Sequence, residues 1–313
     1  MVSHPAQDTT PDAALIRLAH AVRDTGYSFV TPTPATIGRV NARPGAEWAT
    51  DLRGVFGWSR PFRDGVVPAA MLSLMQDAGL LASDPGGARS LVRLSSLGGE
   101  VFLHSAYPTT AADAVFFGPD TYRFVSAIQA HRRAAPVRRA VDIGCGAGPG
   151  AVTVARAWPG AEVLAVDINE VALHMTRVNA AVAGVEVSAV NSNLLSGVEG
   201  AFDLIVANPP YLVDPGERAY RHGGGPLGAG LSLAILDAAL GRLAAGGTLL
   251  LYTGAAIVNG TDPFREAAAT RFAEVDAAWT YQELDPDVFG EELDGGAYVI
   301  ADRIAAVLLT VTT

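Results

Sequence analysis

The chain has 313 residues, of which 50% are hydrophobic and 17% charged, and its mean hydropathy is +0.26. This composition is typical of a globular protein, and at roughly 150 residues per domain the length predicts about two domains. The low charged fraction excludes a disordered chain. No apolar run approaches the ~20 residues that span a bilayer. The polar start from Met1 to Thr10 lacks a secretion signal. The single cysteine, Cys145, excludes a disulfide framework, and the six histidines lack metal-ligand spacing. We therefore expect a cytoplasmic protein without a metal and without membrane contact.

The charge is unevenly distributed along the chain. All 22 basic residues are arginine. Residues 1–110 hold nine arginines and nine acids, whereas residues 111–313 hold 13 arginines and 23 acids, so the net charge of −10 lies in the second part (13 − 23 = −10). Nucleic-acid binding requires a basic surface that releases counterions from phosphates. This distribution therefore argues against a nucleic-acid partner.

The first part, residues 1–110, predicts helices followed by a hairpin. Three segments carry apolar residues at helical spacing, namely 13–23, 46–56 and 68–81. The apolar segments 91–95 and 101–104 flank Gly98-Gly99, which predicts a β-hairpin. Helices followed by a hairpin are similar to a winged helix. Because this part has no net charge, we expect it to cap a substrate or to form a homodimer rather than to bind DNA.

In the second part, residues 111–313, apolar strands alternate with helical segments from Arg138 onward. The expected strands are 140–143, 163–166, 185–190, 203–207 and 248–252, and the expected helices are 151–157, 171–183 and 231–244. This alternation predicts an α/β fold with a mostly parallel, Rossmann-like sheet covered on both faces, beside the smaller helical and hairpin domain of residues 1–110. Ligands of such folds bind beyond the carboxyl ends of the strands. The residues that follow each strand are therefore the candidate site.

A glycine-rich turn, Gly144-Cys145-Gly146-Ala147-Gly148, follows the first strand of this alternation. Closely spaced glycines let the backbone approach a ligand and turn into a helix. Asp167 ends the second strand, 19 residues past Gly148 (167 − 148 = 19), where a carboxylate either binds ribose hydroxyls or caps the helix that follows. After the third strand, Asn193 would bond an adenine amino group and Leu194 would supply apolar contact. These residues predict a nucleotide-containing cofactor, and by itself the turn leaves a nicotinamide dinucleotide open.

The fourth strand runs into Asn208-Pro209-Pro210-Tyr211. Two consecutive prolines lack N–H groups, so they end the strand and stiffen the backbone before them. The Asn208 side-chain oxygen and the Pro209 carbonyl can then both accept hydrogen bonds, and Tyr211 offers a flat ring beside them. Two acceptors and a ring face suit a planar NH₂ group.

Together these motifs resemble the class I S-adenosylmethionine-dependent methyltransferases, and more narrowly the HemK/PrmC family, which carries Asn-Pro-Pro-Tyr and methylates glutamine amide nitrogens. The resemblance covers roughly residues 113–313, and it includes the pocket segment 116–121 and the glycine-rich segment 223–231. It implies a seven-stranded sheet and S-adenosylmethionine as the cofactor. The catalytic residues that it implies are Asn208, Pro209, Pro210 and Tyr211. The cofactor-binding residues that it implies are Phe117, Pro119, Thr121, Asp142, Gly144, Cys145, Gly146, Gly148, Asp167, Ile168, Asn193, Leu194 and Asn208.

The function predicted from these residues is methyl transfer to a planar amide or guanidino nitrogen, of either a protein glutamine or an amino-acid-like small molecule. Methylation of the adenine N6 in RNA or DNA shares the Asn-Pro-Pro-Tyr motif and is the alternative. An NAD-dependent oxidoreductase leaves that motif unexplained. The segment 283–294 holds six acids and no base, so it is either a solvated loop or a surface that attracts a cationic acceptor.

Overall fold

The computed structural model describes residues 10–131, 136–218, 220–273, 275 and 277–313. The polar start from Met1, on which the absence of a secretion signal rests, lies outside these residues except for Thr10. The chain divides into two compact units. The first comprises Met1–Thr110, Phe116–Pro119 and Val178–Gly184, and the second comprises Ala111–Val115, Asp120–Arg177 and Val185–Thr313. In the part of the chain that the structure describes, no helix has both the length and the apolar composition that a bilayer crossing requires.

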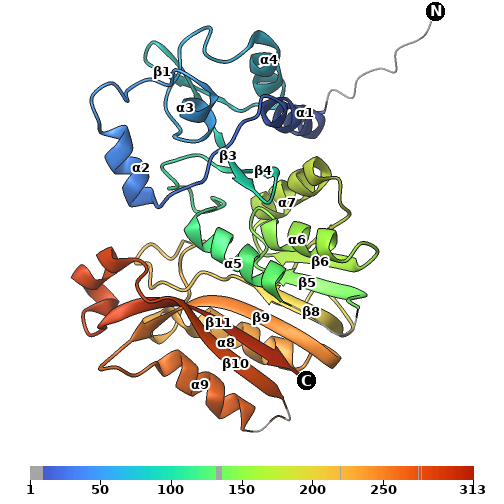
Figure 1. The fold of residues 1–313 in the computed structure, drawn as a ribbon. Coiled ribbons are helices and arrows are strands. Elements are labelled where there is room, and N and C mark those ends of the chain that lie inside the picture. Colours follow the sequence, from blue (N-terminus) through green and yellow to red (C-terminus); the bar gives the residue numbers. More distant parts are fainter. Residues whose placement is uncertain (1–9, 132–135, 219, 274, 276) are drawn as a thin grey trace, which may run out of the picture. The chain divides into compact units, whose positions relative to one another are not determined.

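The first unit contains four helices and two hairpins among its described residues (Figure 1). Its elements are α1 (Pro11–Asp24), α2 (Pro34–Asn41), α3 (Leu52–Phe56), α4 (Ala69–Asp77), β1 (Leu81–Asp84), β2 (Gly87–Ser90), β3 (Val92–Leu97) and β4 (Glu100–Ser105). Strands β3 and β4 pair antiparallel from Val92↔Ser105 to Leu97↔Glu100, so the expected hairpin forms.

Helix α3 is shorter than the helix expected at 46–56. It begins at Leu52 because the Asp51 side chain accepts a hydrogen bond from the Gly54 N–H at 2.7 Å and so caps the helix there. The sequence analysis missed α2 and the β1–β2 hairpin. Thr33 caps α2 and Pro34 opens it, which is a regular helix start.

The second unit is built on one seven-stranded sheet (Figure 1). Its helices are α5 (Pro119–Ala130), α6 (Pro149–Ala157), α7 (Glu170–Ala183), α8 (Gly230–Leu240) and α9 (Pro263–Phe272). Its strands are β5 (Arg139–Ile143), β6 (Glu162–Asp167), β7 (Ser188–Asn191), β8 (Phe202–Ala207), β9 (Leu243–Ile257), β10 (Ala278–Asp285) and β11 (Arg303–Thr312), in the order β10-β11-β9-β8-β5-β6-β7. Short 3₁₀ turns occur at Pro226–Gly228, Gly290–Asp294 and Gly296–Tyr298. Only the β11 pairings are antiparallel, so the predicted α/β fold with a mostly parallel sheet is confirmed.

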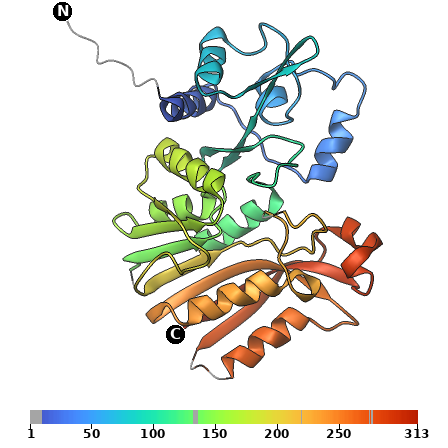
Figure 2. The same ribbon diagram turned by 180° about the vertical axis from the view of Figure 1, so that it is seen from behind.

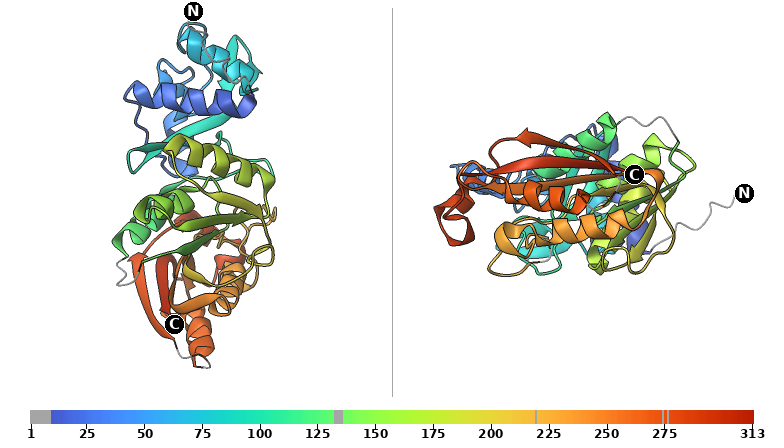
Figure 3. Two further views of the ribbon diagram at one scale, coloured as in Figure 1. Left: turned by 90° about the vertical axis from the view of Figure 1, so that its right-hand side faces the viewer. Right: turned by 90° about the horizontal axis from the view of Figure 1, so that it is seen from below.

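Helices cover both faces of this sheet. On one face, Phe124 of α5 and Leu173 of α7 share a buried cluster with Leu204 and Tyr252 of the sheet. On the other face, a second cluster joins α8 and α9 to the sheet through residues such as Phe264. Figure 2 shows α8 and α9 in front of the strands, and Figure 3 shows the sheet between them and α5. The expected helix 231–244 ends at Leu240, where Gly241 follows as its C-cap, and β9 begins three residues later.

Candidate functional site

The site is defined by two neighbouring strands, β5 and β8, at the centre of the sheet. They pair parallel, with Ile143 opposite Ala207. Gly144 and Asn208 are the next residues of the two strands, so the glycine-rich turn and the Asn-Pro-Pro-Tyr segment leave the same edge of the sheet side by side. The chain continues from β5 to β6 on one side and from β8 to β9 on the other. Ligands of open α/β sheets bind at such a reversal of strand order.

The glycine-rich turn is tied to the end of β6. The Gly144 N–H donates to the Val166 carbonyl at 2.8 Å, and the Gly146 N–H donates to Asp167 Oδ2 at 3.0 Å. The other carboxylate oxygen of Asp167 accepts the Asn169 N–H at 2.9 Å. Burial raises the pKa of Asp167 above the ordinary carboxyl value, while these backbone donors oppose the rise. Each oxygen keeps a lone pair, so the carboxylate can still accept hydrogen bonds from ribose hydroxyls.

The residues around this turn fit an adenosine-bearing cofactor. Gly144 has φ +70°, and a Cβ added there would meet no atom within 4 Å, so the backbone faces open space. Ile168, directly after Asp167, is 62% exposed although it is large and apolar. After β7, Asn193 is exposed and Leu194 is half-buried. An acceptor carboxylate, exposed aliphatic side chains and a free amide are the groups that a ribose and an adenine require.

The side chains of Asp142 and Cys145 form hydrogen bonds within the protein. Asp142 is 2% exposed and accepts the Ala151 N–H at 2.8 Å. Burial raises the pKa of Asp142 to about 7, and the nearby Asp167 charge adds to the rise. Thr176 Oγ1 donates to Cys145 Sγ at 3.4 Å, and burial raises the pKa of this thiol well above its usual range. The thiol is therefore neutral. Both side chains support the glycine-rich turn from the protein interior. Their contact with a cofactor stays a prediction.

The pocket segment predicted at 116–121 is divided between the two units. Phe117 belongs to the first unit, where it is 1% exposed and stacks on His104 with ring centroids 5.0 Å apart. Pro119 begins α5 and also belongs to that unit, whereas Thr121 is buried in the second. Their roles toward a cofactor stay predictions.

The Asn-Pro-Pro-Tyr segment presents two free acceptors. Asn208 is half-buried and Pro209 is buried. Among the hydrogen bonds of the described residues, none involves the Asn208 side chain or the Pro209 carbonyl. Both oxygens therefore keep their lone pairs, and their contact with N–H groups of a ligand stays a prediction.

Tyr211 is enclosed by protein rather than open to a ligand. It is 6% exposed, and its hydroxyl donates to Asp120 Oδ2 at 2.7 Å. The ring lies edge-on to Phe289 at 5.8 Å, and a Cβ on Gly254 would lie 2.2 Å from the ring carbons. Only glycine permits this approach. The expected free ring face is therefore mostly covered, and its contact with an acceptor stays a prediction.

The glycine-rich segment 223–231 folds back onto the residues after Tyr211. Gly223 N–H donates to the Leu212 carbonyl at 2.8 Å, and Leu231 N–H donates to the Gly223 carbonyl at 2.7 Å. Tyr298 Oη accepts the Val213 N–H at 3.0 Å. These bonds fix the segment that follows Asn208-Pro209-Pro210-Tyr211.

The acidic segment 283–294 is half neutralised. Three of its carboxylates are paired with arginines: Glu283 with Arg303, Asp285 with Arg123, and Glu292 with Arg221. The other three, Asp287, Glu291 and Asp294, are exposed. Attraction of a cationic acceptor to this segment stays a prediction.

Sequence reasoning missed the groups around Tyr211. Asp120 lies in the predicted pocket segment, and Tyr252 ends the predicted strand 248–252, but nothing in the sequence indicates that Asp120 contacts residue 211. A buried tyrosine on an otherwise aliphatic strand was the available signal, because a buried phenol requires a hydrogen-bond partner.

Comparisons with known proteins show which family the chain is related to. The family model described as "Methyltransferase small domain" matches residues 120–259. The chain is similar to the release factor glutamine methyltransferase of Deinococcus radiodurans, with 34% identity over 64% of this chain and 72% of that protein. It is also similar to the release factor glutamine methyltransferase of Chlorobaculum tepidum, with 32% identity over 46% of this chain and 54% of that protein. A shorter match, 36% identical over 23% of this chain and 21% of the relative, is to the ribosomal RNA small subunit methyltransferase C of Serratia proteamaculans.

These matches confirm the predicted methyltransferase and S-adenosylmethionine as its cofactor. The glycine-rich turn after β5 and the segment Asn208-Pro209-Pro210-Tyr211 after β8 are the two motifs that carried the resemblance, and the structure places them side by side. The chain belongs to the class I S-adenosylmethionine-dependent methyltransferases, in the HemK/PrmC family.

Proposed function

We propose that this protein transfers a methyl group from S-adenosylmethionine to the amide nitrogen of a glutamine side chain in another protein. The observation that carries the proposal is the pair of unbonded acceptors at Asn208 and Pro209, the first two residues after β8, which pairs with the strand that leads into the glycine-rich turn. The release factor glutamine methyltransferases among the relatives support glutamine as the acceptor.

A primary amide suits these two acceptors. Its planar NH₂ group has two N–H donors, one for Asn208 Oδ1 and one for the Pro209 carbonyl. An amide nitrogen is a weak nucleophile because its lone pair is delocalised into the carbonyl, so holding it in one orientation is the main task of the protein. Orientation supplies up to ~7–11 kcal/mol in favourable cases. The two oxygens would also stabilise positive charge that grows on nitrogen, at ~3 kcal/mol each by analogy with oxyanion donors.

The cofactor would be held by the residues at the ends of β5, β6 and β7. Asp167 would accept the ribose hydroxyls, Ile168 and Leu194 would contact the adenine, and Asn193 would bond its amino group. Bound S-adenosylmethionine supplies the methyl group as an electrophilic carbon on a sulfonium. No base of this chain is required, because the nitrogen becomes acidic as it is alkylated and its proton can pass to water.

The first unit would cap the protein substrate or form a homodimer. Its described elements offer a hairpin and four helices for either role. Sedimentation of the full chain, alone and with an acceptor protein, separates the two roles.

The test is transfer from methyl-labelled cofactor to separate pools of release factors, ribosomal proteins, ribosomal RNA and arginine-like metabolites. The proposal expects label in a protein pool, on a glutamine, with loss of labelling when that glutamine is replaced by alanine. Label in the RNA pool instead would favour methylation of ribosomal RNA, for which the short match to the ribosomal RNA enzyme is the supporting observation. Label only in the metabolite pool would also contradict a protein acceptor.

A further inference from the structure

Three side chains from three elements converge on the carboxylate of Asp120. Tyr211, after β8, donates its hydroxyl to Oδ2 at 2.7 Å. Tyr252 of β9 donates its hydroxyl to Oδ1 at 2.7 Å, and Arg123 of α5 donates to Oδ1 at 3.2 Å. Asp120 itself is 8% exposed. One carboxylate therefore joins the start of α5, strand β9 and the acceptor segment.

In the two bonds from the tyrosines, the phenol is always the donor and the carboxylate is always the acceptor. Burial and the Asp120 charge raise the pKa of Tyr211 and of Tyr252 far above the usual phenol value. Both phenols therefore stay protonated and can only donate to the carboxylate. Arg123 supplies the compensating charge and also pairs with Asp285 at 2.5 Å. Hydrogen bonds to a charged partner are stronger than neutral ones.

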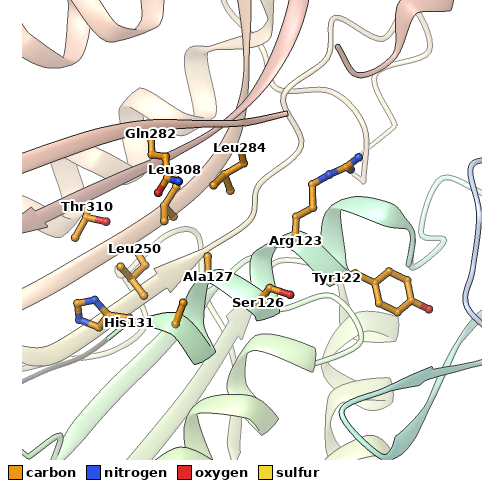
Figure 4. A pocket seen from close by; sticks show the side chains of 11 residues that line it. Tyr122, Arg123, Ser126, Ala127, His131, Leu250, Gln282, Leu284, Leu308 and Thr310 are labelled. Carbon is orange, nitrogen blue, oxygen red and sulfur yellow. The ribbon is translucent and has the colours of Figure 1, made fainter. Parts of the chain in front are cut away.

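Beside this cluster, residues of α5 and of β9, β10 and β11 line a cavity of about 560 Å³ (Figure 4). Arg123, Ser126 and Ala127 line it from the helix, and Leu250, Gln282 and Leu308 line it from the strands. On this side of α5, the bonds from Asp120 to Tyr252 and from Arg123 to Asp285 bridge helix and sheet.

The position of Tyr211 determines where the acceptor oxygens of Asn208 and Pro209 lie. The Tyr211 ring contacts Gly254 and Phe289, and the Asp120 bond sets where its hydroxyl lies. The two residues before it are prolines, whose rings restrict φ to near −65°. A shift of Tyr211 would therefore move the Pro209 carbonyl and Asn208 rather than be absorbed by the backbone between them.

We propose that Asp120 is a positioning residue of the methyl transfer, which holds Tyr211 and through it the two acceptor oxygens of Asn208 and Pro209. The inference rests on the proposed role of those two oxygens. Asp120 touches neither acceptor and, on this account, contributes through Tyr211 alone.

A double-mutant cycle tests the proposal in the full chain with Asp120→Asn, Tyr211→Phe and the double variant. Because a hydrogen bond to a charged group contributes ~1.5–3 kcal/mol, each single change should lower kcat about 10- to 100-fold. Tyr211→Phe removes only the bond that Asp120→Asn also alters, beside the bonds from Tyr252 and Arg123, so the double variant should be no more than about 3-fold slower than the slower single variant. KM for the acceptor and the Kd for S-adenosylhomocysteine should stay within about 3-fold of the wild-type values.

Two matched variants separate positioning from general damage. Tyr252→Phe removes a bond of the same length to the same carboxylate, but from β9 rather than from the acceptor segment, so it should lower kcat far less than Tyr211→Phe. Asp203→Asn changes a carboxylate near the start of β8, at the opposite end of this strand from Asn208. This carboxylate accepts the Arg138 and Arg139 N–H groups, and its change should leave kcat unchanged. Additive losses in the double variant, an equal loss from Tyr252→Phe, or a parallel loss of cofactor affinity would overturn the proposal.

A crystal structure of Asp120→Asn gives a readout that needs no acceptor. The Tyr211 ring and the Pro209 carbonyl should move in this variant, and an unchanged position of both would overturn the positioning role. This result is independent of whether glutamine is the acceptor, so failure of the proposed substrate and failure of the positioning role are distinguishable.

Discussion

Asp142→Asn is expected to stabilise the protein increasingly as the pH rises. The carboxylate is 2% exposed inside the sheet, and burial raises its pKa from 3.8 to about 7. Between these two values the folded state keeps a proton that the unfolded state has lost, so the carboxyl lowers the stability as the pH rises from about 4 to about 7. A difference of about three pKa units corresponds to ~4 kcal/mol at pH 8, since one unit is about 1.4 kcal/mol. Asparagine keeps an oxygen for the Ala151 N–H but carries no charge.

The measurement is urea unfolding of both proteins at pH 5, 6, 7 and 8. The free energy of unfolding of Asp142→Asn minus that of the wild type should grow by about 2–3 kcal/mol between pH 5 and pH 8. Other titrating groups cancel in this difference. Asp203→Asn is the matched control, because that carboxylate also accepts backbone N–H groups but is only half-buried. A difference that is constant or shrinks with pH would refute the reasoning.

Three further predictions concern the site and the first unit. Asn208→Ala should lower kcat by about 100-fold or more, as loss of an oriented acceptor does, with unchanged cofactor affinity in calorimetry; equal losses of affinity and turnover would contradict its assignment to the acceptor. Asp167→Asn should weaken cofactor binding about 10-fold and leave kcat at saturating cofactor nearly unchanged, whereas unaltered binding would remove Asp167 from the cofactor site. Burial and the neighbouring Arg93 hold the pKa of His104 well below its usual 6.5, so protonation below that pH opposes folding and stability should fall as the solution is acidified. Its ring resonances should not titrate between pH 5.5 and 8, and a midpoint near 6.5 would show that the ring is not buried as described.

The sequence predicts best those features that depend on neighbouring residues. The strands β5, β6 and β8 are short apolar runs, and each candidate motif follows one of them directly, so their meeting at one sheet edge follows from parallel pairing. The β3–β4 hairpin was visible because its turn carries two glycines. Helix α2 was missed although Thr33 and Pro34 are a regular start, because proline also marks loops.

The contacts of Tyr211 could not be predicted, because they depend on pairs distant in sequence. Its partner Asp120 lies 91 residues earlier, and the glycine against its ring, Gly254, lies on another strand. No local pattern records such a pairing. The same holds for Asp142, whose burial follows from packing of α6 on the sheet and not from its immediate neighbours.

A crystal structure with S-adenosylhomocysteine and a glutamine-containing acceptor peptide tests the central claim most directly. The account predicts that the glutamine amide nitrogen lies about 3 Å from both Asn208 Oδ1 and the Pro209 carbonyl oxygen, with the cofactor sulfur facing it. A peptide whose glutamine lies away from these two oxygens, or a sulfur directed elsewhere, would contradict it.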